Sequence, residues 1–206
     1  MIQEERTQRS RAAILDAALA LFSTQGYRAT SMRDVAQKAQ VSIGNVYHHF
    51  EDKETIFREL LDTFWRVVET PEFPVTRALT EGTFPENLEA LGHAAQESIA
   101  KYRPYVRLIY VDVVEFAGSH IRKFYSEMAS VFERFVEAHK DEIRLEGKLR
   151  RDIPPAEAIM FVFRTFLQHF AVELVFGVPD HYGKSTNQIV HEISDIMRSG
   201  LLQVKG

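Results

Sequence analysis

The sequence contains no cysteine among its 206 residues. Disulfide bonds, zinc sites built on thiolates and cysteine nucleophiles are therefore excluded. A large excess of one charge is also missing, because 25 Lys and Arg stand against 29 Asp and Glu, which gives a formal net charge of -4. Residues 1–50 nevertheless contain six basic and four acidic side chains, which leaves nineteen and twenty-five for the other 156 residues. The first part of the chain is therefore the part whose local charge favours an anionic partner such as nucleic acid.

An uninterrupted apolar segment of membrane-spanning length is absent. The most apolar stretch, residues 158–176, contains Arg164, His169 and Glu173, so we interpret it as a buried helix rather than a membrane span. The N-terminal residues 1–11 are polar and lack the apolar segment of a secretory signal. We therefore expect a cytoplasmic protein with no membrane partner.

Sustained period-two alternation, the pattern of a strand, is missing as well, whereas apolar residues recur at three- and four-residue spacing. The sequence therefore predicts an all-α protein of about nine helices. Pro71, Pro74, Gly82 and Pro85 make continuous helix improbable between residues 69 and 86, which we interpret as a connection. The expected helices cover residues 7–24, 32–39, 43–49, 52–69, 86–101, 104–116, 119–146, 155–176 and 185–203.

Two short helices near the N-terminus have clear start signals. Ser31 and Asp34 have the spacing of a capping box, and Ser42 is a second candidate N-cap. The residues between the helices, Gln40 and Val41, are too few for anything but a tight turn. Such a pair is the geometry in which the second helix lies in the DNA major groove while the first crosses the backbone.

The second short helix carries the candidate DNA contacts. Val46 and Phe50 are expected to face inward, which leaves the remaining side chains outward. Lys53, in the first turn of the next helix, is a candidate phosphate ligand, and His49 is assigned to structure. An ordinary helical hairpin with incidental polar groups fits the spacing equally well. The expected outward residues are Ile43, Gly44, Asn45, Tyr47 and His48.

The segments GYRATSMRDVA, AQVSIGNVYHHF and DKETIF resemble the N-terminal domain of the TetR family of transcriptional regulators. The resemblance is ungapped from about Arg11 to Leu60. It implies a three-helix helix-turn-helix DNA-binding domain over residues 1–53, a connecting helix at 52–69, and a helical effector-binding and dimerisation domain over 54–206. It also implies DNA contacts by Thr30, Ser31, Arg33, Ser42, Ile43, Gly44, Asn45, Tyr47, His48 and Lys53.

Two departures from the family pattern affect this region. Gln40 stands where the family often has glycine, so the turn is expected to place a non-glycine residue near the left-handed region. Ile43 stands where Lys or Pro is frequent, which replaces a cationic contact by an apolar one and leaves the base preference at this position open.

The rest of the chain is rich in aromatic residues, most of which must be core. The resemblance implies a cavity among the middle helices, and the residues we expect to line it are Trp65, Tyr102, Tyr105, Tyr110, Phe124 and Phe166. Because residues 158–176 are apolar almost all round, they need cover on two sides. Together with the last helix they resemble the dimer interface of the family, with Phe163, Phe170, Ile189, Ile193 and Met197 as the expected contacts.

The sequence therefore predicts a one-component regulator, by default a repressor, that binds a palindromic operator as a homodimer and is released by a hydrophobic small molecule. One alternative is an architectural DNA-binding dimer without an effector. A helical enzyme is the other alternative, although G-x-G-x-x-G, P-loop, H-E-x-x-H and repeated E-x-x-H motifs are absent. No cofactor and no metal are expected. The effector, the operator, the regulated genes, the sign of regulation and the number of bound dimers are left open by the sequence.

Overall fold

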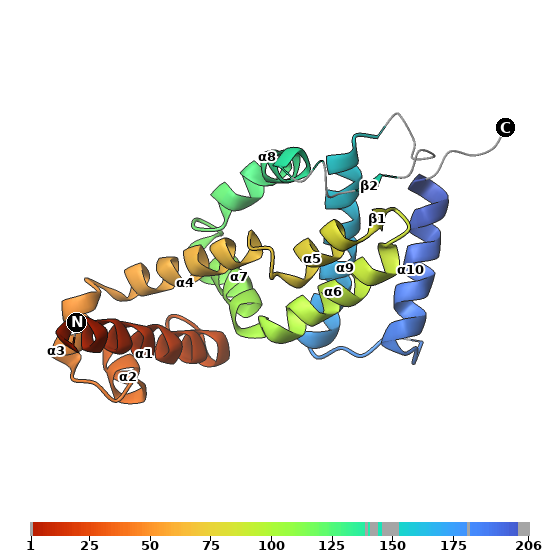
Figure 1. Cartoon of the computed structure of the whole chain (residues 1–206). Helices are drawn as coiled ribbons and strands as arrows, with labels where there is room; N and C mark the ends of the chain where they lie inside the picture. The colour runs from red at the N-terminus through yellow and green to blue at the C-terminus, as the bar shows by residue number, and fades with distance from the viewer. Residues whose placement is uncertain (1, 139, 141–143, 146–152, 181, 202–206) are drawn as a thin grey trace. The chain divides into compact units, whose positions relative to one another are not determined.

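The computed structural model describes the chain except for residues 1, 139, 141–143, 146–152, 181 and 202–206. The described residues form ten helices and two strands of two residues each, which confirms the all-α class (Figure 1). The chain divides into two compact units. Unit 1 comprises Met1–Val67 with Pro104–Lys123, and unit 2 comprises Val68–Arg103 with Phe124–Gly206.

Unit 1 is built from α1 (Ile2–Gln25), α2 (Met32–Lys38), α3 (Ile43–His49), most of α4 (Lys53–Val68) and most of α7 (Arg103–Phe116). One hydrophobic core joins these helices, and it takes side chains from each of them. Its largest fully buried members are Ile14, Phe22, Phe50, Ile56, Phe57, Leu60 and Leu61, with Leu108 from α7.

The helix signals that the sequence predicted are present in unit 1. Gly26 follows α1 with φ at +89°, a left-handed conformation that glycine adopts without steric cost. Ser31 and Asp34 form a complete capping box at α2, and the Ser42 hydroxyl accepts a hydrogen bond from the Asn45 amide at α3. Gln40 has φ at +57°, which confirms the strained turn residue.

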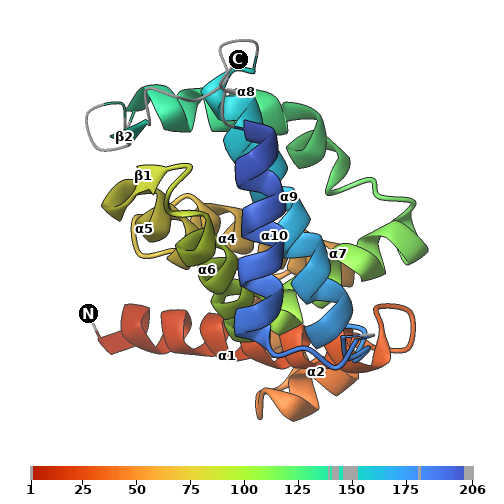
Figure 2. The ribbon, with the colours of Figure 1, turned by 90° about the vertical axis from the view of Figure 1, so that its right-hand side faces the viewer.

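Unit 2 contains α5 (Pro74–Glu81), α6 (Leu88–Lys101), most of α8 (Arg122–Ala138), α9 (Pro155–Leu174) and α10 (Thr186–Leu201). Helix α6 packs against both α9 and α10, which lie side by side in Figure 2. A Cβ added at Gly92 of α6 would lie 2.8 Å from atoms of both Phe166 and Val190. The absence of a side chain at Gly92 therefore lets the three helices approach closely.

Three details of unit 2 differ from the sequence prediction. The proline-rich connection contains the two-turn helix α5, which is possible because Pro74 occupies the first turn, where a backbone donor is not needed. Strands β1 (Thr83–Phe84) and β2 (Arg144–Leu145) pair in parallel, a long-range contact with no local pattern. Helix α8 ends at Ala138 within the described residues, short of the expected 146.

The limits of the two compact units differ from the domain boundary that the sequence analysis expected at residue 53. Unit 1 continues to Val67 and includes 104–123, because Phe57 of α4 and Leu108 of α7 are buried in the same core as α1–α3. The assignment of effector binding to residues 54–206 stays a prediction. None of the described helices is long and apolar enough to cross a membrane.

Candidate nucleic-acid interface

The α2–α3 pair is held by one tight turn and one apolar contact surface. The Gln40 amide donates to the Gln37 carbonyl at 3.2 Å, and the Val41 amide donates to the Ala36 carbonyl at 3.0 Å. Val35 of α2 and Val46 of α3 are both fully buried. This packing fixes the direction of α3, which is the element expected to enter the major groove.

One face of α3 is free of contacts with the core. Ile43 is 39% exposed and Tyr47 is 55% exposed, while Val46 and Phe50 on the opposite face are buried. Ser42, Gly44 and His48 are exposed as well. The predicted outward orientation is therefore confirmed for Ile43, Gly44, Tyr47 and His48, and contact of these residues and of Ser42 with DNA stays a proposal.

Asn45 requires a correction, because it does not simply face outward. Its side chain is half-buried, and its Oδ1 accepts a hydrogen bond of 2.8 Å from the Ser10 hydroxyl of α1. One polar end of the amide therefore holds α3 against α1. A base contact by Asn45 would have to use the amide group that remains.

The start of α2 also divides into exposed and buried residues. Ser31 and Arg33 are exposed, as a DNA contact needs. Thr30 is only 1% exposed, and its hydroxyl donates to the Gly26 carbonyl at 2.8 Å. The expected DNA contact by the Thr30 side chain is therefore wrong, because this side chain closes the turn after α1.

Lys53 is occupied within the protein. Its Nζ donates to the carbonyl oxygens of Tyr27 and Thr30, each at 2.6 Å, and lies 4.0 Å from the centre of the Tyr27 ring. Burial lowers the pKa of the Lys53 ammonium from its ordinary value. We therefore revise the expected phosphate clamp: the first role of Lys53 is to cap the carbonyl groups between α1 and α2.

His49, which the sequence analysis assigned to structure, is half-buried at the end of α3. Burial, followed by the charges of His48 and Arg11, lowers the pKa of His49. A lowered pKa favours the neutral ring at pH 7, as expected for a packing residue. The neighbouring Arg11 pairs with Glu59 and lies over the Phe50 ring at 5.0 Å, which ties α1 to α3 and α4.

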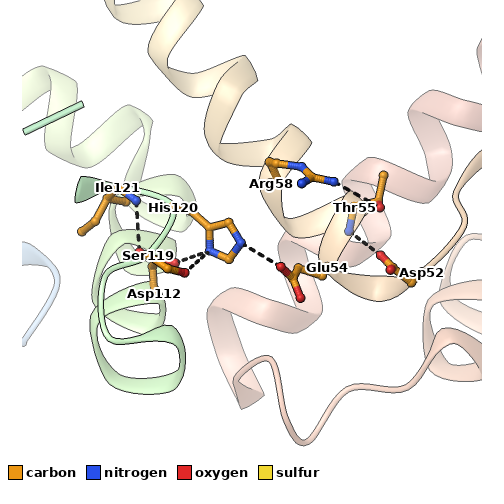
Figure 3. A network of polar contacts seen from close by, with 8 residues as sticks. All are labelled: Asp52, Glu54, Thr55, Arg58, Asp112, Ser119, His120 and Ile121. Carbon is orange, nitrogen blue, oxygen red and sulfur yellow. Dashed lines mark hydrogen bonds and ion pairs between the residues drawn. The ribbon is translucent and has the colours of Figure 1, made fainter. Parts of the chain in front are cut away.

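Helix α7 contributes polar groups that the sequence analysis did not include in the site. Figure 3 shows the His120 ring between the carboxyl groups of Asp112 and Glu54, at 2.6 Å and 3.3 Å. Asp112 is fully buried and also accepts a hydrogen bond from the Ile121 amide at 3.2 Å. The network thus ties the first turn of α4 to the end of α7. Only the folded structure reveals it, because the participating segments are distant in sequence.

The six aromatic residues expected to line an effector cavity are divided between the two units. Trp65, Tyr105 and Tyr110 belong to unit 1, whereas Tyr102 and Phe166 belong to unit 2. Tyr105 stacks on Phe64 with ring centres 5.4 Å apart, and Phe166 is fully buried. The side chain of Phe124 lies outside the described residues. A shared cavity therefore stays a proposal.

The expected dimer contacts on α9 and α10 are corrected in part. Phe170, Ile189 and Met197 are buried inside their own unit, at 0%, 4% and 7% exposure, so they offer little surface to a partner. Ile193 is half-buried. Phe163 is also half-buried and packs on Phe132, with ring centres 5.7 Å apart. The same two helices expose other apolar side chains, namely Phe161 at 61% and Ile196 at 74%.

Comparison with known proteins gives a consistent set of relatives. Residues 14–60 match the family model described as bacterial regulatory proteins, tetR family. The chain is 36% identical to the HTH-type transcriptional repressor KstR2 of Mycobacterium tuberculosis over 91 residues. This alignment covers 40% of this chain and 44% of the relative. KstR2 of Rhodococcus jostii is 28% identical over 158 residues, 74% of both chains.

Among solved structures, a TetR-family transcriptional regulator from Mesorhizobium loti has a TM-score of 0.62 and 26% identity, over 94% of this chain and 96% of that chain. The match to the Mycobacterium relative spans less than half of that protein's length. All three relatives are named as transcriptional regulators or repressors, and none as an enzyme.

Proposed function

The chain belongs to the TetR family of bacterial regulatory proteins, and on this premise we propose that it is a one-component transcriptional repressor. As a homodimer it binds a palindromic operator in the cytoplasm through α3, and a hydrophobic small molecule releases it. The name of the KstR2 relatives supports repression rather than activation.

The observation that carries this proposal is the exposed face of α3. Ile43 and Tyr47 are exposed on a short helix whose opposite face is locked into the core by Val46 and Phe50. A side chain such as Tyr47 can reach phosphate, and Ile43 can touch a thymine methyl. One helix of seven residues contacts too few base pairs for useful specificity, so two copies on a two-fold axis are required.

The test is selection of DNA from a random-sequence pool by the purified full-length protein. We expect the enriched sequences to be inverted repeats whose half-sites lie about one helical turn, or a multiple of it, apart. Enrichment of a single unpaired half-site would contradict the dimeric mode of binding. No enrichment under conditions where the protein is folded would contradict DNA binding itself.

Two buried polar atoms in unit 2 support an effector rather than a purely architectural protein. Within the described residues, Nε2 of His169 and Oε2 of Glu173 are two of the four buried side-chain polar atoms without a hydrogen-bond partner, beside Oδ1 of Asn87 and Oγ of Ser194. His169 and Glu173 are one helical turn apart on α9, and Phe166 stands seven positions before Glu173 and therefore on the same face. Buried polar groups are normally paired, so a ligand or water is expected to complete them.

The chemistry of this face suggests the class of effector. Phe166 offers an apolar surface, while a carboxylate accepts hydrogen bonds and repels a negative charge. We therefore expect an apolar molecule that carries a hydroxyl or amino group. The test measures release of fluorescent operator DNA by anisotropy, for the wild type and for Glu173→Gln. The added probes are long-chain alcohols and carboxylates of the same chain length.

Release by the alcohols that weakens in Glu173→Gln supports the proposal. Release by the carboxylates alone would contradict the expected ligand class. The architectural alternative predicts that no small molecule stays bound to the protein through purification. Native mass spectrometry would detect such a molecule. The same alternative predicts that none of the probes changes operator affinity.

A further inference from the structure

The turn between α1 and α2 is held from two sides by opposite charges. The carboxylate of Glu115, on α7, accepts hydrogen bonds from the backbone amides of Tyr27 at 3.1 Å and Arg28 at 2.8 Å. The ammonium of Lys53, on α4, donates to the carbonyls of Tyr27 and Thr30. Two backbone amides of the turn therefore bind α7, and two of its carbonyl groups bind α4.

The approach of Glu115 is close and the site is sheltered. A Cβ added at Gly26 would lie 3.0 Å from Oε1 of Glu115, so glycine provides the space for the carboxylate as well as the left-handed φ. The Glu115 side chain is only 15% exposed. Hydrogen bonds from backbone amides to a carboxylate that is shielded from water are stronger than neutral ones.

Helix α7 is itself fixed at this end. The Phe116 ring lies 4.6 Å from the Tyr27 ring and 5.0 Å from the Phe57 ring, centre to centre. The network of Asp112, His120 and Glu54 joins the same end of α7 to the first turn of α4 (Figure 3). A displacement of the α7 end would therefore move the turn that Glu115 holds.

This turn leads directly into the DNA-contacting helices. Thr30 is followed by Ser31, the N-cap of α2, and α2 fixes the direction of α3 through their shared core. We propose that Glu115 is a positioning residue for operator binding: through the 26–30 turn, α7 sets the orientation of α2 and α3. This inference rests on the proposed function. The match to the family model ends at residue 60, so it does not assign this role.

Because Glu115 is negatively charged, the direction in which its substitution changes operator affinity tests the proposal. An acidic side chain in a DNA-binding unit repels phosphate, so its removal by itself would strengthen binding, most of all at low salt. A positioning role predicts the opposite. For Glu115→Gln, whose amide keeps one acceptor oxygen, we expect operator affinity to fall by about tenfold, the equivalent of one charge-assisted hydrogen bond.

The experiment measures binding of full-length wild type, Glu115→Gln and Glu51→Gln to a selected operator at several salt concentrations, with circular dichroism at the assay temperature to verify folding. Glu51, between α3 and α4, is exposed and serves as the matched acidic control. We expect Glu51→Gln to bind as well as the wild type or better. We expect Glu115→Gln to bind more weakly, with a salt slope no shallower than that of the wild type, because no phosphate contact is removed.

Unchanged or tighter binding by folded Glu115→Gln would overturn the proposal. If Glu115→Gln is not folded in the assay, Glu115→Asp, which keeps the charge on a shorter side chain, provides the same comparison without a change of charge. Failure of the wild type to bind any selected DNA would instead contradict the proposed function, so the two failures are distinguishable.

Discussion

At the scale of single residues, the structure distinguishes side chains that contact the surroundings from side chains that hold the site together. Tyr47 and Arg33 are exposed, whereas Thr30 and Lys53 use their polar atoms within the protein. Residue type alone does not reveal this difference, because a lysine near a helix start suits phosphate and carbonyl oxygens equally well.

Lys53→Ala tests this distinction. The variant loses two hydrogen bonds to the carbonyls of Tyr27 and Thr30, so we expect weaker operator binding and a lower free energy of unfolding. The slope of log affinity against log salt should stay unchanged. Arg33→Ala is the matched control, and it should flatten that slope by about one unit. A loss of about one unit in Lys53→Ala would show that its ammonium contacts phosphate, as the sequence predicted.

Two histidines with opposite pKa shifts give a prediction for pH dependence. The pKa of His49 is lowered by burial, so the unfolded chain binds its proton more readily and stability is lost as the pH falls through the unfolded value of about 6.5. The pKa of His191 is raised by the Glu89 carboxylate, so its contribution is present below that pH and is lost as the pH rises through the folded value.

Chemical unfolding of the wild type, His49→Gln and His191→Gln on both sides of this pH tests the signs. Relative to the wild type, His49→Gln should gain stability as the pH falls, and His191→Gln should lose it. The same direction in both variants would contradict the assignment.

At the scale of structural elements, short helices begin and end where local chemistry dictates. Ser31, Asp34 and Ser42 satisfy free amides at the starts of α2 and α3, which is why these boundaries could be predicted from the sequence. The turn between the two helices keeps Gln40 at a positive φ, at a cost of about 1 kcal/mol for a side chain with a Cβ.

Gln40→Gly should therefore raise the free energy of unfolding, by up to about 1 kcal/mol, because glycine adopts this φ without the steric penalty. Ala39→Gly is the matched control. Ala39 has an ordinary helical φ of -75°, so glycine there should lower stability by about 0.5–1 kcal/mol. Equal effects of the two substitutions in urea unfolding would exclude strain at Gln40.

At the scale of the whole molecule, dimerisation depends on which apolar residues remain outside each protomer. On α9 and α10 these are Phe161 and Ile196, at 61% and 74% exposure, whereas Phe166 and Met197 on the same two helices are buried. A charge at a buried position would unfold the protein, and it would therefore give no information about the interface.

Ile196→Glu is expected to give folded monomers that bind the operator poorly, because half of the contacts are lost. Sedimentation velocity gives the oligomeric state and circular dichroism gives the fold. Val114→Glu introduces the same charge at an exposed position on α7, where Val114 is 80% exposed, and should leave the dimer intact. An intact dimer in Ile196→Glu would place the interface elsewhere.

The sequence by itself determined the features whose causes are local. These are the helical class, the limits of α2 and α3, the caps, the positive φ at Gln40 and the resemblance around Ser42–Phe50. Each follows from residues within one or two helical turns, since capping, turn conformation and amphipathic periodicity involve near neighbours in the chain.

Only the tertiary structure decided which of several suitable residues face inward. Helix α9 is apolar almost all round, so its periodicity is compatible with burial of either Phe161 or Phe170, and packing against α6 selects Phe170. The same holds for the contact of Glu115 with the turn after α1, 87 and 88 positions away in the chain. Such contacts depend on how distant segments pack, and that information is not contained in any local pattern.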